Sequence, residues 1–420
     1  MNKKFYLSIL FGLSWLGIST YFAVSWVNDI SVYLPEVYVW FVVLGIALMP
    51  GFLMGTMFFS NVMNKNVLKC PDTDICVSVI MCAKDEEKSL SGSIKCLVNQ
   101  TYKGKIKILV VDNNSKDKTK EIIEKYERNS SENREVRYVL CSKCGKCNAL
   151  NCALGMIETE YFITVDADTF LDRRAVQNIM NHITYKKCGC VAGNLFAKSG
   201  RSLISRMQIY DYMLSIAAIK RFQGSYKSTL VAQGAFSAFS TVCVKKFGGW
   251  KKCLGEDIVL TYEMLKRNIP STYEPTAVGY TGVPETMRTF IRQRKRWAIG
   301  MLEGFAYVKP WQQGSVYSKF FSSVNVFVIF LDLAYVFGFV PGVVMCVLGY
   351  PFFVSVFTLY AVGVSLILFY SLYRFQLSIG IPFKSDFFAF FCFLFFFQVF
   401  QSIAALYGYA VRILRIQSAW

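Results

Sequence analysis

Pairs of carboxylates recur in the middle of the sequence, close to the ends of predicted strands. Asp166 and Asp168 form an Asp-x-Asp pair directly after the apolar run 161–165, and Glu256 and Asp257 form a second pair downstream. Two carboxylates near one point supply the hard oxygen ligands that Mg²⁺ or Mn²⁺ prefers when it bridges the phosphates of a nucleotide. One carboxylate can also serve as a general base. An Asp at a strand end is frequently only a turn or helix cap, so these pairs alone do not decide the chemistry.

A cationic stretch lies further along the chain. Residues 291–297 read Ile-Arg-Gln-Arg-Lys-Arg-Trp, which makes Gln293, Arg296 and Trp297 candidates for binding a substrate. Arg and Lys bind phosphate oxygens through charge-assisted hydrogen bonds. A Trp ring offers a flat face against which a sugar ring can pack. The alternative is a basic flank beside a membrane span, where cations collect on the inner side.

The middle of the chain alternates predicted strands with predicted helices, which are the elements that must position these groups. Apolar runs typical of strands cover residues 76–81, 106–111, 136–140 and 161–165, with helical periodicity between them. Such alternation predicts an α/β fold with a mostly parallel sheet covered on both faces. Ligands in these sheets bind at the carboxyl ends of the strands. Glu86 follows the first strand, Asp112 ends the second, and Lys146 begins the third helix.

Two uncharged runs long enough to span a bilayer, residues 5–27 and 37–59, open the chain. Lys3 and Lys4 precede the first run, and the positive-inside tendency therefore places the N-terminus in the cytosol. The first run is too long for a signal-peptide core and predicts an uncleaved anchor. We therefore expect two N-terminal transmembrane helices within residues 1–60 and a cytosolic α/β domain over 61–290.

The last third of the chain is again mostly apolar. Residues 291–319 are expected to carry the cationic motif and helices that lie at the membrane interface, with 298–308 as a short amphipathic helix. Residues 320–420 are expected to form about three transmembrane helices. Asp332 is the one charge in the run 320–373, and a carboxylate inside a span is a functional candidate because its burial in lipid is costly.

Composition supports a membrane protein. The chain has 420 residues, a hydrophobic fraction of 54% and a formal net charge of +18, and its mean hydropathy is +0.36. This is too apolar for an ordinary soluble enzyme. With membrane spans present, anionic lipid and an anionic substrate explain the positive charge better than nucleic acid does.

Cysteine and histidine offer one competing interpretation. Cys141, Cys144, Cys147 and Cys152 have a spacing similar to that of iron–sulfur ligands, but the Pro that follows such ligands is absent. The 14 cysteines are irregularly spaced in a long chain, which favours reduced thiols. His182, the only histidine, lies on a predicted helix and is expected to be solvated.

The candidate residues follow one another in a characteristic order. In sequence they are Glu86, Asp112, Gly145-Lys146-x-x-Ala149-Leu150-Asn151, Asp166-x-Asp168, Glu256-Asp257 and Gln293-x-x-Arg296-Trp297. This set closely resembles the processive family 2 glycosyltransferases, the group of cellulose, chitin, hyaluronan and poly-N-acetylglucosamine synthases. The resemblance covers about residues 77–308 and the arrangement of spans. It implies a nucleotide-sugar-binding, Rossmann-like glycosyltransferase A domain inserted between transmembrane helices of a multi-pass cell-membrane protein, with the catalytic domain in the cytosol.

For the donor, the resemblance implies a role for five residues. Asp112 would bind the uridine, and Asp166 would contact the nucleotide. Asp168 would ligate the Mg²⁺ or Mn²⁺ ion on the diphosphate. Glu86 and Lys146 would complete the substrate-binding set. The sequence departs from the family at 82–86, where Cys-Ala-Lys-Asp-Glu replaces the usual Pro-x-x-Asn-Glu, and at 112–115, where Asp-Asn-Asn-Ser replaces Asp-Asp-Gly-Ser. Which residue touches the uracil is therefore left open.

For the acceptor, the resemblance implies that Asp257 is the general base that deprotonates the attacking hydroxyl. Glu256 would bind substrate beside it. Gln293, Arg296 and Trp297 would close over the diphosphate and hold the growing chain end. An inverting transfer needs one base opposite a stabilised leaving group, which this set supplies.

The polymer is a narrower question. The run 191–297 resembles poly-N-acetylglucosamine synthases more than hyaluronan or cellulose synthases, and implies synthesis and export of poly-β-1,6-N-acetylglucosamine, a biofilm exopolysaccharide, from UDP-GlcNAc. Hyaluronan-, chitin- or cellulose-like synthesis and non-processive glycosylation of a membrane lipid remain alternatives. A transporter with a nucleotide-sensing domain is disfavoured because a sensor needs no base at Asp257. The expected partners are a UDP-sugar donor, the growing polysaccharide, the lipid bilayer and a small accessory membrane subunit, with no nucleic acid.

Overall fold

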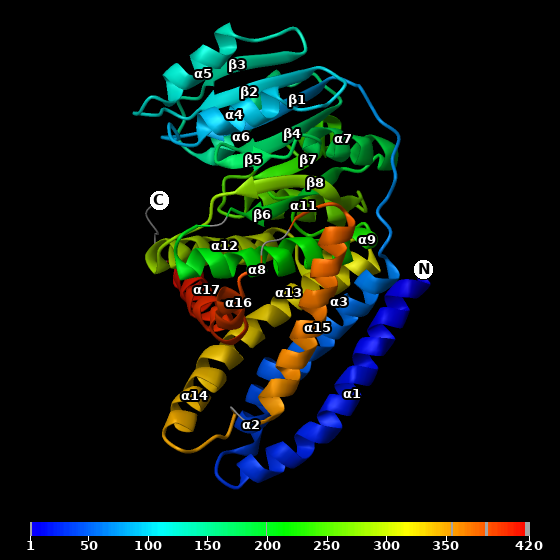
Figure 1. Ribbon diagram of the computed structural model, residues 1–420, viewed down its shortest axis with the longest axis vertical. Coiled ribbons are helices and arrows are strands. Elements are labelled where there is room, and N and C mark those ends of the chain that lie inside the picture. Colours follow the sequence, from blue (N-terminus) through cyan, green and yellow to red (C-terminus); the bar gives the residue numbers. More distant parts are fainter. Residues whose placement is uncertain (1, 199, 354–355, 383–384, 416–420) are drawn as a thin grey trace.

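The computed structural model describes residues 2–198, 200–353, 356–382 and 385–415. Figure 1 shows an α/β part at one end of the molecule and long helices at the other, with a layer of helices crossing between them. Residues 354–355, 383–384 and 416–420 of the predicted C-terminal membrane segment lie outside the described residues. Within the described residues, the chain order of the α/β part and of the long helices agrees with the order expected from the sequence.

One mixed sheet organises the α/β part. Its eight described strands have the order β3-β2-β1-β4-β7-β6-β8-β5. The strands are β1 (Val77–Ala83), β2 (Ile106–Asp112), β3 (Arg134–Leu140), β4 (Tyr161–Asp166), β5 (Thr169–Leu171), β6 (Cys190–Ala197), β7 (Phe236–Ser240) and β8 (Ser271–Thr281). Strands β1 to β4 pair in parallel, as predicted. The β6–β8 pair is also parallel. The β4–β7, β6–β7 and β5–β8 pairs are antiparallel, so the sheet is mixed, with four of its seven described strand pairs parallel.

Helices cover both faces of this sheet. They are α4 (Leu90–Val98), α5 (Thr119–Arg128), α6 (Lys146–Met156), α7 (Ala175–Lys186), α10 (Thr241–Lys246) and α11 (Glu256–Lys266). Alternate residues of β1 point to opposite faces, as the period of a strand requires. Val79 and Met81 join a core with α4 and α7, whereas Ile80 joins a core with α6 and α11. The sheet is therefore a central layer between two layers of helices.

His182 corrects one expectation. The side chain is buried on α7, and its Nδ1 atom lies 2.7 Å from Oε2 of Glu274 on β8. The helix turns this residue toward the sheet, so the solvated position that we expected is wrong. The histidine joins α7 to β8 through a buried polar contact.

A layer of helices lies between the sheet and the long helices (Figure 1). It contains α8 (Leu203–Tyr212), the π-helical segment η2 (Met213–Ala218), α9 (Ile219–Ser225), α12 (Met287–Tyr307) and the short η3 (Pro310–Gln312). A capping box formed by Thr286 and Thr289 starts α12. The boundary expected at 290/291 therefore falls inside a helix. The segment 298–308, expected to be a separate interfacial helix, is the second half of the same helix.

Four described helical segments are long and apolar enough to cross a membrane, namely Lys3–Ser31, Glu36–Met63, Val316–Val347 and Phe387–Ile413. They comprise α1 (Lys3–Ser31), α2 (Glu36–Val43) with η1 (Leu44–Leu48) and α3 (Met49–Met63), α13 (Val316–Ala334) with η4 (Tyr335–Phe339) and α14 (Val340–Val347), and α16 (Phe387–Cys392) with η5 (Phe393–Phe397) and α17 (Gln398–Ile413). A further helix of 23 residues, α15 (Val356–Ser378), covers the position of the remaining predicted span.

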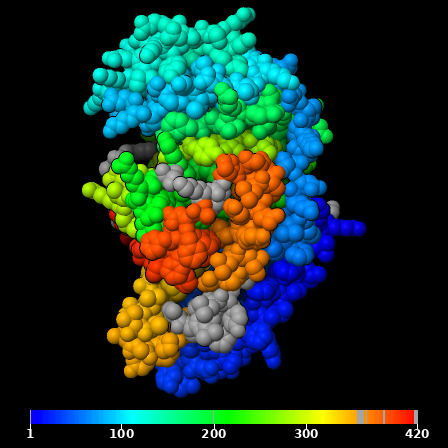
Figure 2. All heavy atoms as spheres, in the orientation of Figure 1, coloured from blue at the N-terminus to red at the C-terminus, as the bar shows by residue number. Residues whose placement is uncertain are grey.

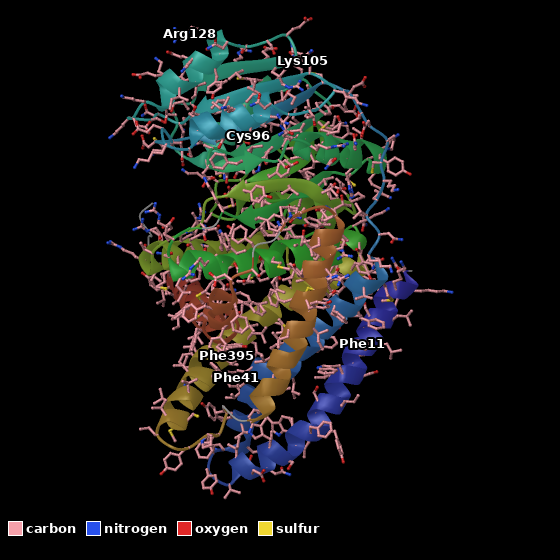
Figure 3. The ribbon with its side chains drawn as sticks, in the orientation of Figure 1. Phe11, Phe41, Cys96, Lys105, Arg128 and Phe395 are labelled. Carbon is pink, nitrogen blue, oxygen red and sulfur yellow. The ribbon has the colours of Figure 1, made fainter. Side chains whose placement is uncertain are left out.

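The two ends of the molecule differ in polarity. In Figure 3, Lys105 and Arg128 lie at the outer end of the α/β part, whereas Phe11 and Phe41 lie among the long helices.

Asp332 of α13 is buried in the helical part, where its carboxylate accepts hydrogen bonds from Ser402 Oγ at 2.7 Å and from Tyr409 Oη at 2.9 Å. This carboxylate therefore joins α13 to α17.

Candidate functional site

The register of the parallel strands brings the first candidate residues together. Ala83 of β1 pairs with Asp112 of β2, and Cys82 of β1 pairs with Asp166 of β4. Because β1 lies between β2 and β4, the two aspartates flank its carboxyl end, and Glu86 follows directly after it. Figure 2 shows a recess in the molecular surface at the left of the view, between the α/β part and the layer of α8 and α12.

Asp112 is held on both of its oxygens. Its side chain is 3% exposed, and Oδ1 accepts a hydrogen bond from the Ser115 amide at 2.9 Å. The Tyr138 hydroxyl donates to Oδ2 at 3.2 Å. The carboxylate therefore shapes the loop after β2, and its expected contact with a uridine stays a prediction.

Asn113 is a positioning residue that the sequence did not single out. Its buried amide group donates to the carbonyl oxygens of Cys141 at 3.1 Å and Lys143 at 2.8 Å. Its Oδ1 accepts from the Gly145 amide at 2.7 Å. Gly145 has a φ of +116°, which only glycine adopts readily. The Asn-Asn pair has the composition of a turn, and nothing in it indicated that Asn113 would hold the loop that leads to Lys146.

Lys146 and Asp166 form an ion pair at the centre of the site. The Lys146 Nζ atom lies 2.6 Å from Asp166 Oδ1. Burial alone would lower the pKa of Lys146, but the charges of Asp166 and Glu256 outweigh it and hold the pKa above its ordinary value. The lysine therefore stays charged at neutral pH, and it links the Asp-x-Asp motif to the Glu256–Asp257 motif.

Asp168 lies in a concentration of negative charge. Burial, followed by the charges of Asp166 and Glu86, raises the pKa of the Asp168 carboxyl to about 6. In the described part of the chain, no group of three or more His, Cys, Asp or Glu side chains is arranged to hold a metal ion. Hard cations such as Mg²⁺ are commonly held by one or two carboxylates together with substrate phosphates. The donor set at Asp168 fits that mode of binding.

The second carboxylate pair begins helix α11. The amide of Ile258 donates to Asp257 Oδ1 at 2.9 Å. Burial, followed by the charge of Asp257, raises the pKa of Glu256 to about 7, although Lys146 opposes this shift. Charge on Glu256 therefore destabilises the folded state.

This raised pKa leads to a prediction for Glu256→Gln. Ionisation of Glu256 weakens the fold as pH rises from the ordinary range of a Glu carboxyl through about 7. The amide of the variant cannot ionise, so its thermal midpoint should exceed that of the wild type at pH 8 by on the order of 5 °C. The difference should shrink toward zero at pH 4.5. Thermal unfolding across this pH range measures it, with Glu263→Gln on the same helix as the control. A constant difference at all pH values would contradict the prediction.

Lys220 lies near Asp257 and was not predicted as a site residue. Its Nζ atom donates to the Val231 carbonyl oxygen at 3.0 Å and to Gln233 Oε1. Gln233 in turn donates to the Gly193 carbonyl oxygen at 2.8 Å. Burial lowers the pKa of Lys220 to about 7, with the charge of Asp257 opposing the shift. A single lysine in an otherwise ordinary stretch of sequence does not reveal whether it is buried or solvated.

Helix α12 presents the cationic motif. The Gln293 Oε1 atom is buried and finds no hydrogen-bond partner among the described residues. Arg296 is exposed on the same helix. Trp297 is 40% exposed, and the Arg294 guanidinium carbon lies 4.3 Å from the centre of its ring. One ring face is thus supported from within the protein, while part of the ring remains accessible.

Arg294 is a residue of this motif that sequence reasoning missed. It is 5% exposed, its NH2 atom lies 2.5 Å from Asp211 Oδ2, and its NH1 atom donates to Gln401 Oε1 at 3.2 Å. Removing either charge from a buried ion pair leaves the other uncompensated. Arg294 therefore anchors α12 to both α8 and α17.

The cysteines between the end of β3 and the first turn of α6 are free thiols. Cys141 and Cys147 are buried, and Cys144 is exposed. The Cys141 sulfur donates to the Lys143 carbonyl oxygen at 3.4 Å, and the Cys147 sulfur donates to the Cys253 carbonyl oxygen at 3.7 Å. The second contact ties the start of α6 to the segment that precedes α11.

Comparison with known proteins identifies the domain. Residues 78–247 match the family model described as Glycosyl transferase family 2. Poly-beta-1,6-N-acetyl-D-glucosamine synthase of Staphylococcus aureus (strain COL) is 27% identical over 250 residues, which are 58% of this chain and 60% of that protein. The synthase of the same name from Staphylococcus epidermidis is 28% identical over 227 residues, or 53% and 54% of the two chains. The chain thus spans less than two thirds of the length of these relatives.

A solved structure supports the fold. The mannosyltransferase PcManGT from Pyrobaculum calidifontis, in complex with GDP-Man and Mn2+, superposes with a TM-score of 0.60 at 16% identity. The match covers 89% of this chain and 99% of that one. The matched family region 78–247 contains the donor-side residues on β1, β2, α6 and β4. The matched region 78–247 is therefore a family 2 glycosyltransferase domain, its fold is that of a glycosyltransferase A-like α/β protein, and the chain is similar to the poly-β-1,6-N-acetylglucosamine synthases.

Proposed function

We propose that this protein is a membrane-embedded, inverting hexosyltransferase that polymerises a β-linked polysaccharide from a UDP-sugar and exports it. The preferred product is poly-β-1,6-N-acetylglucosamine made from UDP-GlcNAc. The observation that carries the proposal is the Lys146–Asp166 ion pair, because Lys146 also lies within the electrostatic reach of Glu256. The Asp166-x-Asp168 motif, proposed to bind the nucleotide, and the Glu256-Asp257 motif, proposed to supply the base, thus share one charged site. The name of the staphylococcal relatives supports the choice of sugar.

On the donor side, the proposal assigns nucleotide binding to Asp112, Asp166 and Lys146, with Glu86 beside them. The Lys146 cation can bind phosphate oxygens once UDP enters. A Mg²⁺ or Mn²⁺ ion held by Asp168 would supply positive charge to the departing diphosphate. The negative charge gathered around Asp168 favours a cation there, because the ion would relieve the repulsion that raises the pKa of this carboxyl.

On the acceptor side, Asp257 takes the proton from the attacking hydroxyl of the chain end. The hydroxyl oxygen forms a bond to the anomeric carbon, and the bond between that carbon and the UDP oxygen breaks with inversion. Glu256 contributes to substrate binding beside the base. Arg296 neutralises charge on the diphosphate, and Gln293 turns its unpaired oxygen toward a hydroxyl or amide of the substrate. Trp297 packs against the terminal sugar.

The choice of a polymerase over a lipid glycosyltransferase rests on α12. This helix carries the partly exposed Trp297 and packs against α17, so an acceptor held on Trp297 would lie close to the long helices through which a growing polymer would leave. A non-processive transferase needs to hold one acceptor sugar only briefly. A bilayer around the long apolar helices and a small accessory membrane subunit complete the proposed partners.

The test is a reaction of purified protein in lipid nanodiscs with UDP-GlcNAc and either Mg²⁺ or Mn²⁺. UDP release and product length are measured together, and the product is digested with a β-1,6-specific hexosaminidase. We expect long, digestible chains, and we expect a chelator to stop both signals. UDP-glucose and UDP-glucuronic acid serve as control donors. Formation of only a glycolipid, or of polymer only from a control donor, would refute the proposed product.

A further inference from the structure

Helix α12 is joined to the segment before α11 through one carboxylate. Glu303 Oε2 accepts hydrogen bonds from the amide of Leu254 at 2.7 Å and from the amide of Gly255 at 3.1 Å. These two amides immediately precede Glu256 and Asp257. Hydrogen bonds to a charged acceptor are stronger than those between neutral groups. Glu303 thus contacts the backbone that leads directly into the proposed base.

Two glycines bring α12 unusually close to α11. A Cβ atom at Gly300 would lie 2.9 Å from the Cα atom of Gly255, and a Cβ atom at Gly304 would lie 2.7 Å from Cγ2 of Ile258. Neither position has room for a side chain without a shift of its neighbour. Steric contact therefore limits the approach of the two helices, and Glu303, between the two glycines, prevents them from separating.

The opposite side of α12 is also fixed. A Cβ atom at Gly408 of α17 would lie 2.7 Å from the carbonyl oxygen of Lys295, and Arg294 donates to Gln401 of α17. Helix α12 is thus held between α11 and α17. A change on its α11 side moves the start of α11 more easily than it moves α12.

We propose that Glu303 is a positioning residue that sets the separation between Asp257 and Trp297. Trp297 lies six positions before Glu303 on the same helix, which is roughly 9 Å along the axis. Glu303 therefore ties the residue that would hold the acceptor sugar to the residue that would deprotonate it. The inference rests on the proposed function, since it requires Asp257 as the base and Trp297 as the residue that packs against the acceptor sugar.

Loss of the carboxylate should affect turnover and spare donor binding. Without Glu303, the amides of Leu254 and Gly255 lose their acceptor, and the segment relaxes toward water. A displacement of the base by about 1 Å can lower the rate about 10²-fold. The donor residues Asp112 and Lys146 lie on other elements, so the site for UDP keeps its shape.

The experiment compares four variants in nanodiscs with the wild type. Glu303→Ala should lower kcat about 10- to 100-fold, with KM for UDP-GlcNAc and Kd for UDP changed less than about threefold. Glu303→Gln keeps a carbonyl oxygen that can accept from both amides and should restore kcat to within about threefold of the wild type. Gly300→Ala forces the helices apart and should reproduce the kcat loss. Glu263→Ala, on the outer part of α11, is the matched control and should behave as the wild type.

Three outcomes would overturn the inference: a wild-type kcat in Glu303→Ala, no rescue by Glu303→Gln, or a loss of UDP binding in Glu303→Ala, which would indicate a general structural role. Failure of the proposed function looks different, because the wild-type protein itself would then bind UDP without forming a sugar polymer.

Discussion

Replacing Asp257 with Asn is expected to lower the rate of sugar transfer by about 10²- to 10⁴-fold, the usual contribution of a general base. The amide has nearly the shape of the carboxylate and can still accept the hydrogen bond that the Ile258 amide donates to Oδ1. It cannot take a proton from the acceptor hydroxyl. UDP affinity should change by less than about threefold, because the base acts on the acceptor and not on the nucleotide.

Transfer rates and UDP affinities measured on the same preparations test this expectation. Glu263→Gln is the control, since it removes one carboxylate from the same helix outside the site. A variant that retains activity within about tenfold of the wild type would show that Asp257 is not the base. Glu256 would then be the carboxylate to examine, since its pKa of about 7 also suits proton transfer.

Replacing Trp297 with Ala is expected to separate chain extension from donor binding. The ring is 40% exposed, and Arg294 supports it at 4.3 Å. The substitution removes the surface against which a sugar would pack but no charged group. Polymer yield should therefore fall about 10²-fold, because the acceptor is displaced relative to Asp257. UDP and metal binding should remain, and slow hydrolysis of the donor should persist.

Polymer formation, donor hydrolysis and UDP affinity are measured together for this test. Trp297→Phe keeps an aromatic face and should retain part of the activity. Trp311→Ala is the matched control, because Trp311 is 69% exposed on the neighbouring η3 and lies outside the site. Full-length polymer from Trp297→Ala would mean that this residue is only an anchor at the membrane interface.

Strand ends were predictable because a buried strand and its polar terminus leave a strong local pattern. The runs ending before Asp112 and Asp166 predicted β2 and β4 to within one residue, and parallel pairing to β1 then brought the two aspartates to the same edge. The order of the family motifs along the chain then indicated that these strand ends belong to one site. The antiparallel pairs were not predictable, because the pairing of β7 with β4 and β6 depends on contacts between distant segments.

Three residues of the site escaped detection for one physical reason. Asn113, Lys220 and Arg294 are polar side chains, and solvent exposure is the ordinary expectation for residues of these types. Each is buried in the structure. Their burial depends on partners far away in sequence. Lys220 bonds Gln233, which in turn bonds the Gly193 carbonyl oxygen, and Arg294 bonds Gln401 on α17. Local periodicity carries no information about such partners.

The attachment of α12 to α17 has a consequence for how this chain can be divided. Arg294 is neutralised by Asp211 within the catalytic part and also donates a hydrogen bond to Gln401, in the last described helix. Gly408 fits the α12 backbone, and Asp386, ahead of that helix, pairs with Arg206 at 2.7 Å. A soluble fragment that ends before α13 would expose these surfaces and leave their polar groups unmatched. Chimeras between related enzymes should therefore exchange α8, α12, α16 and α17 as one block, because the catalytic domain and the C-terminal helices are not independent modules.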